Sequence, residues 1–259
     1  HRDLHSFPTR RSSDLKYIEP KFKKESNPRI GLLALSTDLT IERDFQSICH
    51  SLPINLFVNR IHNENPLTKE NLLKMYDQLE SITEKILPGE KINTVAYGCT
   101  SGTIAIGEDK VKEKIQLAKP GCHVTTPITS AIKAFNKMNV KKIAVFTPYP
   151  ESVNKTISEY LIKKNINVTS FSTFNLDLDV DFARVDPKYL SEILTKLNIN
   201  DADALFVSCT ALPALEILDE VEKKINKPVF SSNQTLIWDT IRSVGYKSSV
   251  EGYGKLLKN

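Results

Sequence analysis

Residues 92–103 read INTVAYGCTSGT and residues 202–213 read ADALFVSCTALP, so the same local sequence pattern occurs twice in the chain. Each stretch begins with a short apolar run of the kind that forms buried strands. Each run ends in a turn of small polar residues that contains a cysteine, Cys99 in the first stretch and Cys209 in the second. An amphipathic stretch of helical period follows both turns. A strand, a small-residue turn and a helix form a βα unit, so we predict two related units.

The same alternation extends over the rest of the chain. Short apolar runs predict strands at Ile30–Leu35, Ile54–Val58, Thr94–Tyr97, His123–Thr125, Ile143–Phe146, Val168–Phe171, Ala204–Val207 and Val229–Phe230. Helical periodicity predicts helices at Ile41–Ser51, Lys69–Leu87, Thr103–Leu117, Ser130–Met138, Val153–Lys164, Lys188–Leu197, Ala214–Ile225 and Leu236–Val244. Near-continuous apolar strands that alternate with helices are typical of parallel sheets covered on both faces. We therefore predict an α/β fold of the doubly wound type.

The outer units also repeat. Residues 29–40, RIGLLALSTDLT, correspond to residues 142–153, KIAVFTPYPESV. The first residues of this pair are 113 positions apart and the two cysteines are 110 apart. Such similar offsets predict that the chain contains two structurally related halves. We assign residues 16–121 and 228–259 to lobe 1 and residues 122–227 to lobe 2.

The first fifteen residues, HRDLHSFPTRRSSDL, read like the translation of a sequencing-library adapter. We predict that residues 1–15 are a non-native scar and interpret the sequence from Lys16 onward. A short tail is the alternative.

The composition of the 259-residue chain argues against several classes of protein. The net charge is only +4, and Lys and Arg are spread along the sequence rather than clustered with aromatic residues, so we expect no nucleic-acid partner. No apolar run reaches the roughly 18 residues that a membrane span needs, and no signal segment follows Lys16. We therefore expect a cytoplasmic protein with no membrane segment.

The four cysteines, Cys49, Cys99, Cys122 and Cys209, stand singly, without a CxxC pair or a cluster of histidines. We therefore expect no metal site and no disulfide. The sequence has no GxGxxG after a strand and no phosphate-binding GxxxxGKS or GxxxxGKT, so no nucleotide cofactor is expected. No histidine follows a strand beside a Ser or Cys, which disfavours a histidine-assisted hydrolase. We interpret Cys49 and Cys122 as small core residues.

Cys99 and Cys209 stand where open α/β sheets bind ligands, at the carboxyl ends of strands. Gly98 and Gly102 flank Cys99, and glycines let backbone N–H groups approach an anion at a helix N-terminus. The positive end of a helix also lowers the pKa of a cysteine and favours the thiolate. We therefore predict that the two cysteines are paired acid/base or nucleophilic groups in one cleft. A buried cysteine that ends a strand is the alternative for each.

The turns after the other strands are expected to supply hydroxyls and amides that orient carboxylates. The candidate residues are Ser36, Thr37, Asp38, Thr147, Tyr149, Ser231, Ser232 and Asn233. Helix capping is the favoured alternative for Asp38, Ser232 and Asn233. Tyr149 lies in a turn between two prolines, so we expect it outside the core.

These residues resemble the aspartate/glutamate racemase superfamily, and within it the group of maleate cis-trans isomerases, arylmalonate decarboxylases and ectoine-utilisation proteins. The resemblance runs from Arg29 to Gly245. It rests most specifically on CTSGT at residues 99–103 and SSNQTLIWD at residues 231–239. It implies two Rossmann-like lobes with parallel sheets related by pseudo-twofold symmetry, an active site in the cleft between them, no cofactor, and a homo-oligomer.

The resemblance also implies roles for individual residues. In maleate isomerases the cysteine that matches Cys99 adds to the double bond of maleate, and the central bond rotates. The cysteine that matches Cys209 handles the proton before elimination gives fumarate. The tyrosine that matches Tyr149 and N–H groups in the turns hold the carboxylates. The turn residues in this chain are Thr100, Ser101 and Thr210, with Ser36, Asp38 and Ser232 as further substrate-binding candidates.

Three alternatives to maleate isomerisation follow from the same resemblance. Racemases and epimerases of amino-acid-type substrates also use two thiols. Arylmalonate decarboxylases carry a glycine in place of the first cysteine, so the presence of Cys99 argues against decarboxylation. A non-catalytic protein that binds a small acid is the third. Asp38 and, near the second site, Asp179 stand where maleate isomerases hold a carboxylate with asparagine. Asp38 therefore points to a substrate with an ammonium or amide group.

Overall fold

The computed structural model describes residues 17–23 and 26–259, so the predicted scar at residues 1–15 lies outside the described residues. The chain forms two four-stranded sheets, ordered β2-β1-β3-β4 and β6-β5-β7-β8. Every strand pair in both sheets is parallel. The strands are β1 (Arg29–Leu35), β2 (Asn55–Ile61), β3 (Thr94–Gly98), β4 (His123–Thr125), β5 (Lys142–Thr147), β6 (Asn167–Thr173), β7 (Ala204–Val207) and β8 (Val229–Ser231). The predicted parallel α/β fold and all eight predicted strands are confirmed.

Helices follow the strands as the βα pattern requires. They are α1 (Ile41–Cys49), α2 (Lys69–Glu84), α3 (Thr100–Ile106), α4 (Glu108–Ala118), α5 (Pro127–Lys137), α6 (Glu151–Lys163), α7 (Asp179–Phe182), α8 (Pro187–Lys196), α9 (Leu218–Ile225) and α10 (Ser232–Ser243), with two 3₁₀ helices at Leu215–Ile217 and Leu256–Lys258. The helix predicted over residues 103–117 is in fact two helices, because Gly107 between them has a φ of 98°. The four-residue helix α7 was not predicted, because so short a segment shows no helical period.

One strand of each sheet, β4 in the first and β8 in the second, lies in the other predicted lobe. β4 pairs with β3 in the first sheet, although it follows the predicted boundary at residue 122. β8 pairs with β7 in the second sheet, although it follows the predicted boundary at residue 228. Sheet membership therefore assigns strand 123–125 to the first lobe and strand 229–231 to the second.

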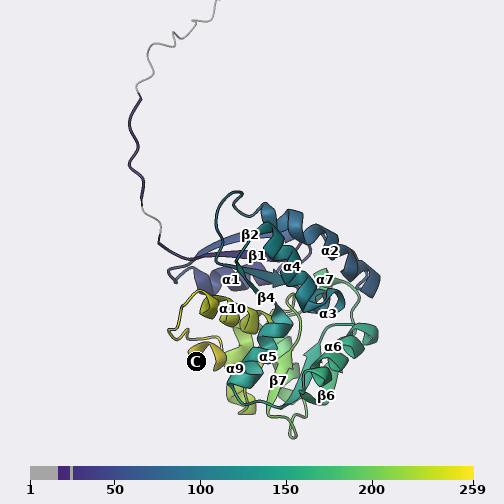
Figure 1. Ribbon diagram of the computed structural model, residues 1–259. Coiled ribbons are helices and arrows are strands. Elements are labelled where there is room, and N and C mark those ends of the chain that lie inside the picture. Colours follow the sequence, from purple (N-terminus) through teal and green to yellow (C-terminus); the bar gives the residue numbers. More distant parts are fainter. Residues whose placement is uncertain (1–16, 24–25) are drawn as a thin grey trace, which may run out of the picture.

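Two helices join the sheets across the middle of the molecule. α5 and α10 pack against each other and lie between the two groups of strands (Figure 1). The ring of Phe135 on α5 packs edge-on against Phe206 and Phe230 of the second sheet, with centroids 5.3 and 5.1 Å apart. α10 contacts β3 and β4 of the first sheet as well as β8. α5 follows a strand of the first sheet but packs on the second, and α10 follows a strand of the second sheet but packs on the first. The two helices therefore bring the sheets together.

Among the described residues, no helix has both the length and the apolar character that crossing a bilayer requires.

Candidate active site

Cys99 caps the N-terminus of α3, directly after β3. Its Sγ accepts a hydrogen bond from the backbone N–H of Gly102 at 3.2 Å and lies 3.8 Å from the hydroxyl of Ser101. The hydroxyl of Tyr97, which donates to Met75 Sδ at 3.5 Å, also lies beside this sulfur and favours its ionised form. The residue is 2% exposed. The predicted position of Cys99 at a strand end and helix start is confirmed, and Tyr97 is a neighbour that we did not predict, because it is fully buried in the strand.

Burial reverses the expected effect on the thiol. The pKa of Cys99 is raised to about 12, because desolvation of the thiolate outweighs the lowering by the N–H of Gly102, and the carboxylate of Asp179 raises it further. The expectation of a thiolate near neutral pH is therefore wrong for the protein without substrate. The interactions with Gly102, Ser101 and Tyr97 each favour the thiolate form of Cys99. They can stabilise that form when the sulfur attacks a substrate.

Gly102 is required by close packing against the sulfur. A Cβ at this position would lie 2.7 Å from Cys99 Sγ, 2.8 Å from Met75 Cε and 2.8 Å from the Tyr97 hydroxyl. Real Cβ atoms do not approach other atoms so closely, so one of these side chains would have to move. The first strand-end turn therefore needs glycine for the thiol to sit at the helix start.

We expect Gly102→Ala to destabilise the protein and to reduce its activity. Overpacking of a buried site costs about 1–3 kcal/mol, and here the added methyl group displaces the reactive sulfur or its tyrosine partner. Thermal unfolding and turnover, measured on the same preparations, test this. An unchanged melting temperature together with unchanged turnover would show that the turn has free space.

Cys209 follows β7 after one intervening residue, Ser208, in the matching turn of the second sheet. It is 2% exposed. The hydroxyl of Tyr149 forms a hydrogen bond with its sulfur, and the backbone N–H of Ala211 forms another. Burial raises the pKa of Cys209 despite both hydrogen bonds, and the nearby carboxylates of Asp179 and Asp38 raise it too. Each cysteine therefore has its own tyrosine partner.

Tyr149 is both buried and close to the sulfur of Cys209. It is 3% exposed, and its ring packs edge-on against Phe182 of α7 at 5.5 Å. The expectation that Tyr149 lies outside the core is therefore wrong. Its hydroxyl is directed to Cys209, and the field of Cys99 also raises its pKa. Tyr149 is thus a neighbour of both cysteines.

Hydrogen bonds between the two sheets bring the cysteine turns together. Thr210 donates to the carbonyl of Gly98 at 3.4 Å, which joins the residue after one cysteine to the residue before the other. The hydroxyls of Thr100 and Ser232 lie 3.1 Å apart. Because these contacts link positions adjacent to both thiols, the two cysteines share one buried site. Thr100, Thr210 and Ser232 therefore lie at this junction.

Asp38 caps its own helix, and its carboxylate also lies beside Thr210 of the junction. Its Oδ1 accepts hydrogen bonds from the N–H groups of Thr40 and Ile41 at 2.7 and 2.9 Å, at the start of α1. This is the capping role that we considered the alternative. Its other oxygen, Oδ2, is enclosed without a hydrogen-bond partner. Burial raises the pKa of Asp38, while Thr210 and Arg60 lower it.

Asp179, on α7, joins the second half of the chain to the first. Its Oδ2 accepts hydrogen bonds from Asn63 Nδ2 at 2.8 Å and from Thr37 Oγ1 at 3.1 Å. Ser36 is exposed and reaches this group by donating to Asn63 Oδ1 at 3.0 Å. The sequence suggested Asp179 only as the position where related proteins have an asparagine. Asn63 was not predicted, because it follows an edge strand and belongs to no recognisable motif. Figure 1 accordingly places α7 beside elements of the first half.

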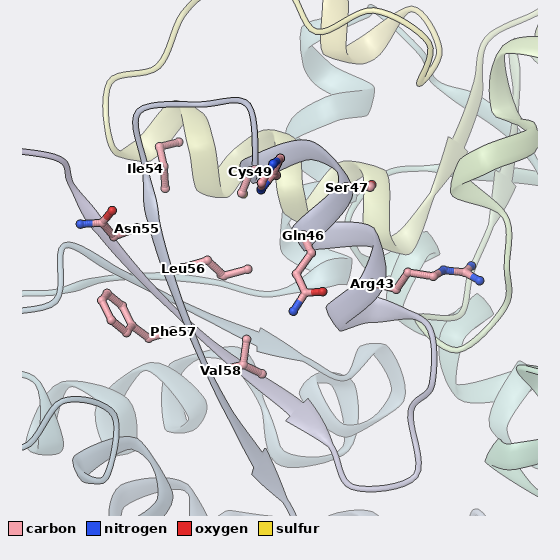
Figure 2. Close-up of a pocket in the computed structure, with 10 residues that line it drawn as sticks. Arg43, Gln46, Ser47, Cys49, Ile54, Asn55, Leu56, Phe57 and Val58 are labelled. Atoms are coloured by element: carbon pink, nitrogen blue, oxygen red, sulfur yellow. The ribbon is translucent and has the colours of Figure 1, made fainter.

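Two hollows lie near these elements. One, of about 970 Å³, lies between α1 and the edge strand β2 and is lined by neither Cys99 nor Cys209 (Figure 2). Leu56 and Val58 point from β2 toward this side, and Gln46 extends from α1. The other, of about 260 Å³, lies between α2, α3 and α6 and is lined in part by Ser101 and Lys69. Because Ser101 contacts the sulfur of Cys99, the smaller hollow adjoins the candidate active site.

Within residues 17–23 and 26–259, no group of three or more His, Cys, Asp or Glu side chains is placed to hold a metal ion. The side chains of the site supply two thiols, two phenols, hydroxyls and carboxylates.

Several known proteins resemble this chain. The maleate isomerase of Geobacillus stearothermophilus is 24% identical over 245 residues, which cover 88% of this chain and 96% of the relative. The arylmalonate decarboxylase of Bordetella bronchiseptica is 27% identical over 139 residues, or 52% of this chain and 58% of that protein.

Solved structures share the fold. The maleate isomerase Iso from Pseudomonas putida superposes with a TM-score of 0.82 at 20% identity, covering 90% of this chain and 99% of that one. A mutant of the Nocardia farcinica maleate cis-trans isomerase with a covalently bound succinylcysteine intermediate superposes equally well, at 18% identity and with the same coverage. The arylmalonate decarboxylase family matches residues 105–257, which is more than half of the sequence. This chain therefore belongs to the arylmalonate decarboxylase family.

Proposed function

We propose that this protein is a cysteine-based isomerase that converts a small cis-unsaturated carboxylate into its trans isomer, with maleate as the first candidate substrate. One observation carries the proposal: Cys99 and Cys209 end equivalent strands of the two sheets and meet in a single buried junction that Thr210 and Gly98 link. The similarity to several maleate isomerases over most of the chain supports it. The presence of Cys99 disfavours decarboxylation, since the related decarboxylases carry glycine there.

The two thiols have different roles in the proposed reaction. The sulfur of Cys99 forms a bond to one carbon of the double bond, while the other carbon takes a proton from Cys209. The proton that the Cys99 thiol loses passes by way of the Tyr149 hydroxyl to Cys209. The resulting single bond rotates. The transfers then run in reverse: Cys209 returns a proton to Cys99 by the same route and removes the proton from carbon, the double bond re-forms in the trans geometry, and the carbon–sulfur bond breaks to release Cys99. Addition and elimination balance, so the reaction consumes no other reactant.

The surroundings of the sulfurs fit this division. Three hydrogen-bond donors, on Gly102, Ser101 and Tyr97, surround Cys99 and stabilise negative charge on its sulfur when it leaves. Cys209 has the Tyr149 hydroxyl beside it, which also neighbours Cys99. The tyrosine is therefore placed to bind a carboxylate or to assist the proton transfer between the two positions.

We expect the purified protein to convert maleate to fumarate. Proton NMR follows this directly, because the two isomers give separate olefinic signals. A Cys122→Ser variant is the matched control, since Cys122 is buried outside the site and should keep full activity. Absence of fumarate with the wild-type protein would remove maleate as the substrate.

Racemisation of an amino-acid-type carboxylate is the second candidate. Two carboxyl groups lie near the thiols, since Asp179 acts on both and Asp38 acts on Cys209, and carboxylates bind ammonium groups. Solvent deuterium at the α-carbon of an amino acid, measured across a panel by mass spectrometry, would favour this reaction over cis-trans isomerisation. Its absence across the panel would count against it.

A further inference from the structure

One carboxylate in the site is used by none of the proposed chemical steps. Asp179 is 4% exposed, and its charge raises the pKa values of Cys99, Cys209 and Tyr149. A single group that acts on all three lies close to the place where a substrate must bind. The carboxylate of Asp179, on α7, is therefore within electrostatic range of both thiols and of Tyr149.

Fixed hydrogen bonds hold this carboxylate in place. Asn63 and Thr37 both donate to Oδ2. Asn63 is itself fixed, because its Oδ1 accepts from Ser36 Oγ and from the backbone N–H of Thr37. Among the described residues, no hydrogen bond reaches the other oxygen, Oδ1, and this atom is not among the fully enclosed polar atoms that lack a partner. Oδ1 is therefore a free acceptor on a rigid group.

The electrostatics of the junction disfavour a second negative charge. Burial raises the pKa of Asp179 to about 6, and the charge of Asp38 contributes to the rise. Because this pKa still lies below 7, the carboxyl group is mostly ionised at neutral pH. The charged groups that act on Cys209 and Asp179 are themselves carboxylates. A substrate carboxylate against Oδ1 would meet a like charge with no donor between them, whereas an N–H group would form a charge-assisted hydrogen bond.

We propose that Asp179 determines specificity by accepting a hydrogen bond from an amide or ammonium group of the substrate, so that the preferred substrate has one carboxylate and one N–H donor rather than two carboxylates. This rests on the proposed isomerase function and narrows its substrate class. The remaining carboxylate binds at the strand-end turns, where N–H groups and hydroxyls are available. A dicarboxylate such as maleate is then a poorer substrate than its monoamide.

The test compares maleate with the monoamide of maleate in the wild-type protein, in Asp179→Asn and in Asp177→Asn. Asp177 is an exposed acid two residues away on the same segment, so its variant removes the same charge outside the site. We expect the wild type and Asp177→Asn to prefer the monoamide in kcat/KM by about tenfold or more, the size of one well-placed polar contact. Asp179→Asn should reverse the preference, because its amide can donate to a carboxylate.

Folding and function are read separately. The side-chain oxygen of an asparagine can still accept the hydrogen bonds from Asn63 and Thr37. Thermal unfolding of each variant checks that the fold is kept. An equal substrate preference in the wild type and Asp179→Asn overturns the proposal. If none of the three proteins isomerises either compound, the proposed function is wrong. Calorimetric binding of succinate and of its monoamide then still tests the role of Asp179 in specificity. A wild-type preference for the monoamide that Asp179→Asn loses supports the role, and equal preferences overturn it.

Discussion

A Cys99→Ser variant is expected to lose turnover by at least about 10³-fold, the order found when an essential nucleophile is removed. Serine keeps the size and the helix-capping position, but its hydroxyl ionises far less readily than a thiol. Burial already raises the pKa of the Cys99 thiol to about 12, so an alcohol in the same enclosed place would not be activated. Initial rates with the preferred substrate measure the loss, and thermal unfolding checks that the fold is intact.

The matched control for Cys99→Ser is Cys122→Ser. Both cysteines are buried in the first half of the chain, but only Cys99 has Tyr97 and Gly102 as hydrogen-bond partners. Loss of turnover in both variants would point to a general effect of removing a buried thiol. Retention of activity in Cys99→Ser would remove the proposed nucleophile.

A Cys209→Ser variant is expected to stop the reaction at the covalent stage. If Cys209 removes the proton that elimination requires, its replacement leaves substrate attached to Cys99. The serine hydroxyl can still supply the proton of the addition step, but it ionises far less readily than a thiol and does not serve as the base of the elimination. The enclosed site, in which Cys209 is 2% exposed, admits little water to replace that base. Intact-protein mass spectrometry after incubation with substrate should show a gain of one substrate mass.

Peptide mapping then identifies the modified residue. The added mass should lie on the peptide that contains Cys99, and the double variant with Cys99→Ser should not acquire it. An adduct on another cysteine, or wild-type turnover by Cys209→Ser, would contradict the assigned roles. Because the readout is a mass and not a rate, it separates a blocked second step from a protein that fails to bind substrate.

The local sequence was sufficient to predict the strands and most helices. β3 and β7 are short apolar runs, and their burial on both faces follows from residue type alone. The position of Cys99 and Cys209 at strand ends follows from chain order, since a residue after a parallel strand lies at the carboxyl edge of the sheet. Cys49 and Cys122 are buried core residues as predicted. These features depend on a few neighbours in sequence, which is why they could be predicted.

Only the tertiary structure decided the electrostatics of the site. The pKa of Cys99 depends on how much water distant segments exclude, and its sequence neighbours suggested the opposite direction. Asp179 reaches Thr37 across 142 positions and Asn63 across 116, a contact that no local pattern announces. The sequence by itself therefore determined the fold and the two thiols. Packing of remote segments determined the acidity of those thiols and brought a carboxylate within electrostatic range of them, because desolvation and charge act through space rather than along the chain.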